Sequence, residues 1–183
     1  MKKNTKKIVT AAGIAAGTAA VASLYAYVTI KALIDTALDR EMPKVMEKAD
    51  KRISGEKSSD EFTNRMESAS ESLAVQPNET VEIIAHDGEK LVGHYFPCEK
   101  PERVIIAFHG WRSSWHRDFG MISDFWYKNN CSVLYVEQRG QNNSSGEYMG
   151  FGLTERFDCL DWLNWEIERC GSDIPVYLAG VSM

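Results

Sequence analysis

The stretch "PVYLAGVSM", residues 175–183, decides how the part of the chain from residue 79 onward is interpreted. Its first residues form a short apolar run of the kind that makes a strand buried on both faces of a sheet. Gly180 and Ser182 follow at once, so a serine stands where the strand would turn into a helix. A Gly-x-Ser triplet alone is common. At the end of a buried strand, however, the small residue two positions before the serine relieves crowding of a strained turn. Ser182 is therefore the first candidate for chemistry.

Two similar apolar runs precede this one, "RVIIAF" at 103–108 and "SVLYV" at 132–136. We expect a helix over 118–129 between them, and a second helix that begins at Thr154 and ends before Gly171. Such an alternation of strands and helices predicts a parallel sheet with right-handed crossovers. Ahead of it, the turn pair at residues 87–88 between two apolar stretches predicts a β-hairpin. The fold class from residue 79 onward is thus α/β.

Each expected helix has an apolar stripe at helical spacing, which we predict faces the sheet. In the first helix the stripe comprises Phe119, Ile122, Phe125 and Trp126. In the second it comprises Leu153, Phe157, Leu160, Leu163 and Ile167, widened by Trp162 and Trp165 as packing residues.

The amino terminus carries a membrane signal. A basic tail over residues 1–7 precedes an uncharged run over 8–30, which exceeds the ~20 residues that a hydrocarbon core requires. An uncleaved anchor and a cleavable secretory signal both fit this pattern; the length of the run favours the anchor. Four lysines before the span place the amino terminus in the cytoplasm and the rest outside, as a single-pass membrane protein, with secretion after cleavage as the alternative. Gly13 and Gly17 form a G-x-x-x-G motif that would permit a homodimer of the anchor.

Residues 31–78 are charged and helix-prone, and we interpret them as a helical stalk between the anchor and an incomplete α/β domain at 79–183. The formal net charge of −5 gives no basic surface for nucleic acid. Four cysteines lack metal-ligand spacing, and there is neither a phosphate-binding loop nor a clustered His/Asp/Cys set. We therefore expect no metal and no cofactor.

Candidate site residues follow directly after the strands, because sites in such sheets form at the carboxyl ends of the strands. His109, Gly110 and Trp111 follow the first parallel strand. The backbone N–H groups of Trp111 and Met183 could together hold a developing oxyanion beside Ser182. His109 is interpreted as structural, with its ring bound to backbone.

Five segments together resemble the first half of an α/β-hydrolase, in the branch of serine aminopeptidase-like, lysophospholipase-like and acyl-thioester hydrolase-like proteins. They are "DGEKLVGHYFP", "VIIAFHGWRSS", "VEQRGQNNSSGEY", "ERFDCLDWL" and "VYLAGVSM", and they occur in the family's order and at similar spacing. Glu137 and Asn142 stand where the family usually has Asp and Gly. Arg139, Gly140, Ser144 and Gly146 match as they stand, and we assign them to loop architecture.

The resemblance implies a serine hydrolase that acts on an ester, thioester or amide of a small-molecule or peptide substrate through an acyl-enzyme. It also implies that the acid and the histidine of the triad follow Ser182 in the chain. All four histidines, at positions 86, 94, 109 and 116, precede that serine. We therefore expect these 183 residues to be a fragment that is inactive alone. The alternative is a surface-anchored binding or scaffold protein with this fold and no activity.

Overall fold

The computed structural model describes residues 2–41, 44, 48 and 60–181, and the side chains of residues 17–18 and from Ala20 onward within those ranges. The chain divides into two compact units, Met1–Asp39 and Arg40–Met183.

The first unit is a single long helix, α1 (Lys2–Leu38). Its segment Ala20–Leu38 is long and apolar enough to cross a membrane, a criterion that a signal sequence near the amino terminus also satisfies. The predicted span at 8–30 overlaps this segment from Ala20 onward, and most of the side chains before Ala20 lie outside the description. The side chains of residues 2–16 lie outside the description, so a homodimer through Gly13 and Gly17 stays a prediction.

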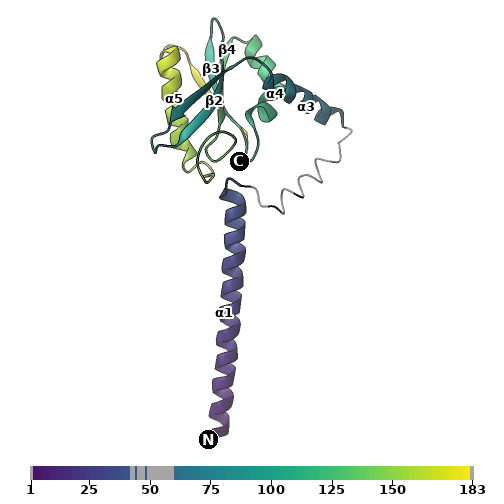
Figure 1. Cartoon of the computed structure of the whole chain (residues 1–183), viewed down its shortest axis with the longest axis vertical. Coiled ribbons are helices and arrows are strands. Elements are labelled where there is room, and N and C mark those ends of the chain that lie inside the picture. Colours follow the sequence, from purple (N-terminus) through teal and green to yellow (C-terminus); the bar gives the residue numbers. More distant parts are fainter. Residues whose placement is uncertain (1, 42–43, 45–47, 49–59, 182–183) are drawn as a thin grey trace. The chain divides into compact units, whose positions relative to one another are not determined.

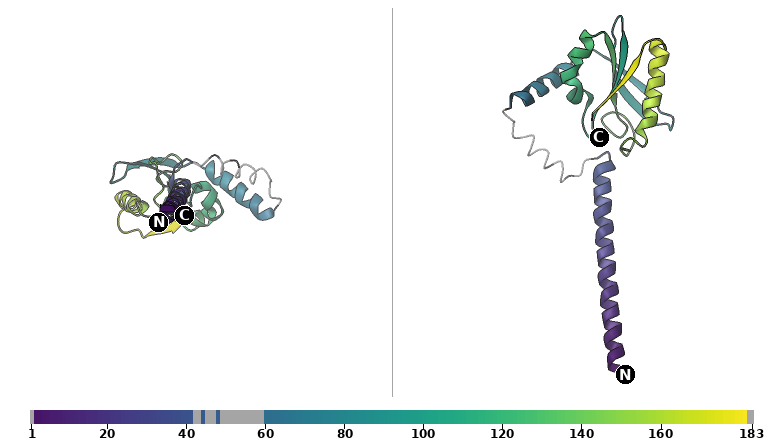
Figure 2. Two further views of the ribbon diagram at one scale, coloured as in Figure 1. Left: turned by 90° about the horizontal axis from the view of Figure 1, so that it is seen from below. Right: turned by 180° about the vertical axis from the view of Figure 1, so that it is seen from behind.

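The second unit is built on a five-stranded sheet with the order β1-β2-β4-β3-β5 (Figures 1 and 2). The predicted hairpin is confirmed: β1 (Glu79–Ile84) and β2 (Lys90–Phe96) are antiparallel and joined through Gly88, whose φ is 94°. The parallel part comprises β3 (Arg103–Phe108), β4 (Cys131–Glu137) and β5 (Val176–Gly180). The antiparallel hairpin joins it through the pairing of β2 with β4.

Two helices cover opposite faces of the sheet, α4 (Trp115–Lys128) on one and α5 (Glu155–Cys170) on the other (Figure 1). One apolar core lies between the sheet and α4 and includes Trp115, Phe119 and Tyr135. The other lies between the sheet and α5 and is centred on the fully buried Trp162. The β-α-β-α-β alternation expected from the sequence is therefore present.

A third helix, α3 (Glu61–Ala74), belongs to this unit, although the sequence places these residues in a stalk. Its Leu73 is buried in the core on the α4 face. A Cβ added at Gly120 of α4 would lie 2.7 Å from backbone atoms of Ala69 and Ser70, so only glycine permits this close approach of the two helices. The side chains of Ser70 and His116 also join the helices, with 2.9 Å between Oγ and Nδ1.

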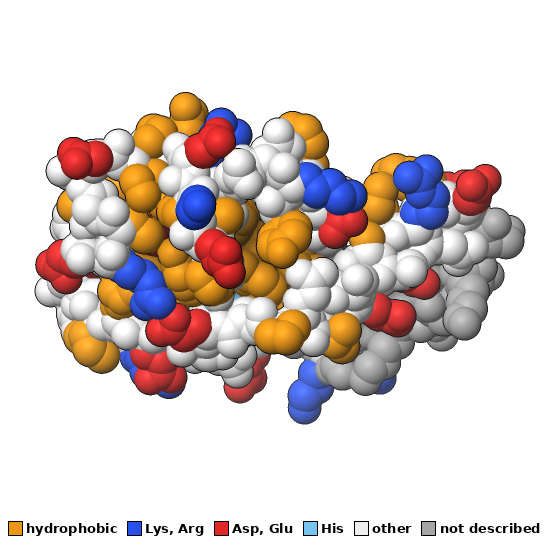
Figure 3. All heavy atoms as spheres, turned by 90° about the horizontal axis from the view of Figure 1, so that it is seen from above, with side chains coloured by type: hydrophobic (Ala, Val, Ile, Leu, Met, Phe, Trp, Pro, Cys, Tyr) orange, Lys and Arg blue, Asp and Glu red, His pale blue; other side chains and the backbone are white. Residues whose placement is uncertain are grey.

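The strand that leads to Ser182 forms one edge of the sheet. In β5, Tyr177 and Leu178 are 55% and 58% exposed, and they point to opposite faces. Several apolar residues of α4 and α5 are also exposed, among them Phe125 and Leu160. Seen from above, hydrophobic side chains gather in the middle of the unit, with charged groups around them (Figure 3).

Candidate active site

The three parallel strands end at the same level of the sheet. Phe108 at the end of β3 lies opposite Val136 of β4 on one side and Gly180 of β5 on the other. The N–H of Val181 donates a hydrogen bond to the carbonyl oxygen of Phe108 at 3.1 Å. Val181, directly after β5, therefore lies beside the end of β3. Ser182 and Met183 themselves lie outside the described residues.

His109 is fully buried directly after β3. Its Nδ1 lies 2.8 Å from the carbonyl oxygen of Gly110, and its Nε2 lies 3.1 Å from the side-chain nitrogen of Asn142. In the neutral ring Nδ1–H therefore donates and Nε2 accepts. Burial lowers the pKa of His109 and favours this neutral form. With both nitrogens engaged, the ring ties the loop after β3 to the loop after β4.

Asp118, in the first turn of α4, organises the loop that contains Trp111. One carboxylate oxygen accepts the backbone N–H of Gly110, and the other accepts the hydroxyl of Ser113, each at 2.7 Å. The N–H of Arg112 donates to the side-chain oxygen of Gln141 at 2.7 Å, although Arg112 has a left-handed φ of 52°. Hydrogen bonds on both sides of Trp111 thus hold the loop in one conformation.

Sequence reasoning missed these roles of Asp118 and Gln141. An acid in the first turn of the following helix was visible as a helix-start signal, but its partners were not.

The loop after β4 is held by Glu137, which the resemblance marked as a departure from the family pattern. Its buried carboxylate lies 2.8 Å from Nε2 of His94 and accepts the backbone N–H of Asn143 at 2.6 Å. Burial works against ionisation, but these hydrogen bonds prevail and hold the pKa of Glu137 below its usual value. Asn142 adopts a φ of 50°, the left-handed conformation that asparagine tolerates in place of glycine.

Gly140 in this loop has a φ of 67°, and an added Cβ would lie 2.8 Å from the carbonyl oxygen of Tyr148. Only glycine fits there. Arg139 beside it is almost fully buried and binds both carboxylate oxygens of Asp158 on α5, and it binds Asp87 of the hairpin turn at 2.7 Å. Asp158, and after it Asp87, raise the pKa of Arg139, so the guanidinium stays charged. Arg139 therefore joins three segments of the chain, the loop after β4, the hairpin turn and α5.

An open pocket of about 280 Å³ lies next to these loops. Its lining includes Arg112 and Ser113 from the loop after β3 and Gly140–Asn142 from the loop after β4. Arg40 also lines it and donates to the carbonyl oxygens of Asn142 and Ser144 at 2.7 and 2.6 Å. Arg40, the first residue of the second unit, thereby holds the loop after β4 in place.

The fold also brings together a histidine and two aspartates, on the side of the sheet covered by α5. His86, Asp158 and Asp161 place one donor atom each within 4.8 Å of one another. His86 and Asp161 are 75 positions apart in the sequence, on the hairpin turn and on α5, so only the fold brings them together.

Comparisons with known proteins agree with the observed fold. No protein-family model matches the chain, and no curated protein matches its sequence. Among solved structures, the chain is similar to the esterase Pf2001 of Pyrococcus furiosus, with 25% identity and a TM-score of 0.52 over 62% of this chain and 44% of that one. It is also similar to the α/β-hydrolase GrgF of a Penicillium species, with 20% identity and a TM-score of 0.50 over 58% and 38%.

A third similar structure is XC6422 of Xanthomonas campestris, an α/β serine hydrolase without a lid, with 16% identity and a TM-score of 0.51 over 58% and 51%. The chain spans less than half the length of the Pyrococcus esterase. The compact unit of this chain therefore has the α/β-hydrolase fold, represented by the amino-terminal half of its sheet.

Proposed function

We propose that this chain is the nucleophile-bearing part of a membrane-anchored serine hydrolase that cleaves ester, thioester or amide bonds through an acyl-enzyme. The observation that carries the proposal is the pairing of Phe108 with Gly180, with the hydrogen bond from Val181 to Phe108. This pairing brings Gly180 and Val181, the two residues before Ser182, to the end of β3, where the loop of Gly110 and Trp111 begins. It supports the proposal because an acyl-transfer site requires the nucleophile next to that loop.

In the proposed reaction the Ser182 hydroxyl oxygen attacks the substrate carbonyl carbon while a histidine takes its proton. The carbonyl oxygen becomes an oxyanion, held by the N–H groups of Trp111 and Met183. The histidine then gives the proton to the leaving group, and water hydrolyses the acyl-enzyme by the same steps. The rigid support of the Trp111 loop by Asp118 favours this role, because an oxyanion site works only when its donors are already in place.

Two of the described histidines are engaged elsewhere and do not suit the role of base. His109 is buried with both ring nitrogens engaged, and His94 is bound to Glu137. The family resemblance assigns the base and its acid to positions after Ser182. For the 183 residues alone we therefore expect no measurable hydrolysis, since a serine hydroxyl without a base is a poor nucleophile.

The remaining parts of the proposal concern location and substrate. We propose that α1 anchors the protein with its basic amino terminus in the cytoplasm and the hydrolase unit outside. The pocket of about 280 Å³ beside Arg112 and Gly140 is the proposed place for the acyl or leaving group of a small-molecule or peptide substrate. The second candidate is a non-catalytic anchored binding protein with the same fold, in which the acid or the histidine expected after Ser182 is lost.

The test is hydrolysis of short-chain p-nitrophenyl esters by the protein expressed from its own gene in its native membrane. Wild type is compared with Ser182→Ala and with Ser68→Ala, a matched control on α3 far along the chain from the strand ends. We expect Ser182→Ala to lose activity by a factor on the order of 10³ or more, and the control to keep it. Equal activity in Ser182→Ala would overturn the nucleophile, and an inactive wild type would favour the binding protein.

A further inference from the structure

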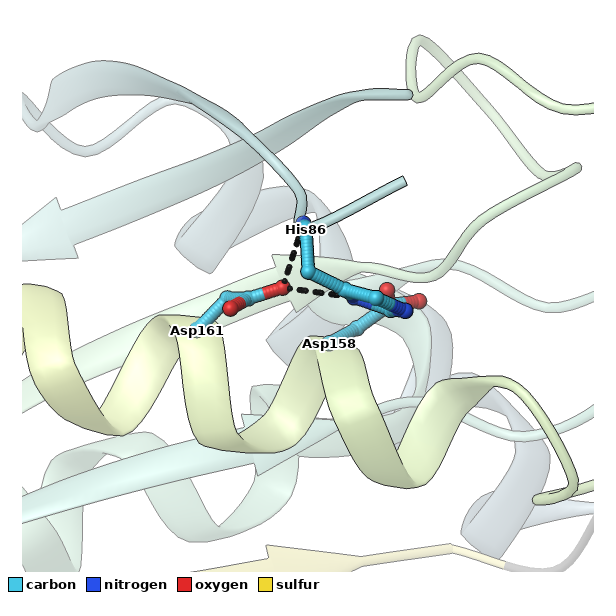
Figure 4. A group of neighbouring side chains, drawn as sticks. All are labelled: His86, Asp158 and Asp161. Carbon is cyan, nitrogen blue, oxygen red and sulfur yellow. Dashed lines mark hydrogen bonds and ion pairs between the residues drawn. The ribbon is translucent and has the colours of Figure 1, made fainter. Parts of the chain in front are cut away.

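A histidine and two aspartates meet where the β-hairpin turn lies against α5 (Figure 4). His86 follows β1, and Asp158 and Asp161 are three residues apart on α5 and so point to the same side of the helix. The backbone N–H and the Nδ1 atom of His86 lie 3.0 and 3.1 Å from one carboxylate oxygen of Asp161. One donor atom from each of the three residues lies within 4.8 Å of the others.

The charge around these residues is unbalanced. The carboxylates of Asp87, Asp158 and Asp161 converge there, and the guanidinium of Arg139 is the partner of two of them. Three carboxylates face one guanidinium and one imidazole, so negative charge exceeds positive charge in this group. Arg139 occupies one position on each oxygen of Asp158, and a carboxylate offers about four acceptor positions, so each oxygen keeps one for another partner.

The distances are compatible with a metal ion as well as with the hydrogen bond between the two side chains. Two ligand atoms at about 2.1 Å from a tetrahedral ion are about 3.4 Å apart, so the 3.1 Å between Nδ1 of His86 and the Asp161 oxygen needs only a small adjustment to admit one. The side of His86 and Asp161 is open, with 44% and 23% of these side chains exposed, while Asp158 is only 5% exposed. Solvent can therefore reach the ion and complete its coordination from one side, while Asp158 anchors it from the other.

We propose that His86, Asp158 and Asp161 bind a divalent transition-metal ion, foremost Zn²⁺. A mixed imidazole and carboxylate set favours zinc over calcium or magnesium, which prefer oxygen ligands alone. The ion joins the hairpin turn to α5 and balances the charge beside Arg139. Its role is structural: binding to the folded state stabilises the fold by mass action. The proposal does not depend on hydrolase activity.

The test is Zn²⁺ binding to the full 183-residue chain, purified in detergent with an affinity tag that contains no histidine and measured by isothermal titration calorimetry. We expect one ion per chain in wild type, and binding at least tenfold weaker in His86→Gln and in Asp161→Asn. His116→Gln and Asp124→Asn on α4 are the matched controls and should bind as wild type does. Circular dichroism checks that each variant is folded; if Asp161→Asn does not fold, the partly exposed His86→Gln decides.

Cys159 lies next to Asp158 on α5, so a thiol could also bind the added metal. Absorption spectra of the Co²⁺-loaded protein distinguish thiol binding from binding by the three proposed ligands. We expect the Co²⁺-loaded protein to show no thiolate-to-cobalt absorption band. Three results would each overturn the proposal: no Zn²⁺ binding in wild type at millimolar concentration, unchanged binding in both His86→Gln and Asp161→Asn, or a strong thiolate band that persists in His86→Gln.

Discussion

The two helices that cover the sheet differ in the side chains they turn inward. The buried residues of α4 are Trp115, Phe119, Gly120 and Ser123, all uncharged. The buried residues of α5 are Glu155, Asp158, Trp162 and Glu166, three of which are acids. Helix α4 is thus held by shape and apolar contact, whereas α5 depends on specific partners for buried charge. The free energy of unfolding should therefore respond to changes of side-chain volume on the α4 face, and to changes of charge and pH on the α5 face.

The three buried acids of α5 differ in the hydrogen-bond partners that they have. Glu155 accepts the N–H groups of Gly150 and Gly152 in the turn before the helix. Asp158 is held on both oxygens by Arg139. Glu166 has only the thiol of Cys170 at 3.6 Å, and its other oxygen has no hydrogen-bond partner among the described residues. Glu166 is therefore the buried acid of α5 whose charge is least compensated by hydrogen bonds.

The largest effect should come from breaking the buried pair of Arg139 and Asp158. Arg139→Leu leaves the carboxylate of Asp158 buried without its partner, and we expect the free energy of unfolding to fall by about 3–5 kcal/mol. Urea unfolding followed by tryptophan fluorescence measures it. The control is Lys90→Met, which removes the exposed pair with Glu82 and should cost less than about 1 kcal/mol. Equal losses in both variants would contradict the difference between buried and exposed pairs.

The next effect concerns pH. Burial raises the pKa of Glu166 from 4.5 to about 7, so the folded state holds its proton over a range where the unfolded state releases it. The fold should therefore lose stability as pH rises from 4.5 through 7, by about 3 kcal/mol in total from this group. Glu166→Gln should remove that slope. Unfolding free energies at pH 5 and pH 8 check it, and the same slope in both proteins would show that Glu166 is not responsible.

The smallest of the three effects tests shape on the α4 face. Gly120→Ala raises helix propensity and would stabilise an isolated helix by about 1 kcal/mol. Here its Cβ would lie 2.7 Å from the backbone of α3, and we expect a net loss of about 1–3 kcal/mol because the helices must separate. Met121→Ala, at the neighbouring exposed position, is the control and should change little. A gain of stability in Gly120→Ala would show that α3 does not pack closely on α4.

The parallel strands were predictable as apolar runs, and the hairpin was predictable from the turn signal Asp87-Gly88 between its two strands. The helices were located within a few residues, but their inward faces were partly wrong. Leu160 and Ile167, expected against the sheet, are 54% and 39% exposed, whereas Asp158 is buried. Periodicity counts apolar residues and takes no account of a distant arginine that stabilises a buried acid.

The packing of α3 was missed for a related reason. Its only buried residue among those described is Leu73, and its docking depends on Gly120 in another helix. At the candidate site, the residues that follow the strands were predictable from topology. Their supports, Asp118 beneath the Trp111 loop and His94 against Glu137, were not, because hydrogen bonds between distant segments leave no local pattern.

The measurement that tests the central claim most directly is covalent labelling by a fluorophosphonate probe of the protein expressed from its own gene, followed by peptide mass spectrometry. A serine becomes reactive toward such a probe only when a base activates it. The proposed function predicts one phosphonylated residue, Ser182, with labelling abolished in Ser182→Ala and unchanged in Ser68→Ala. An unlabelled Ser182 in folded, membrane-bound protein would contradict it and leave this half of an α/β-hydrolase sheet as a binding scaffold.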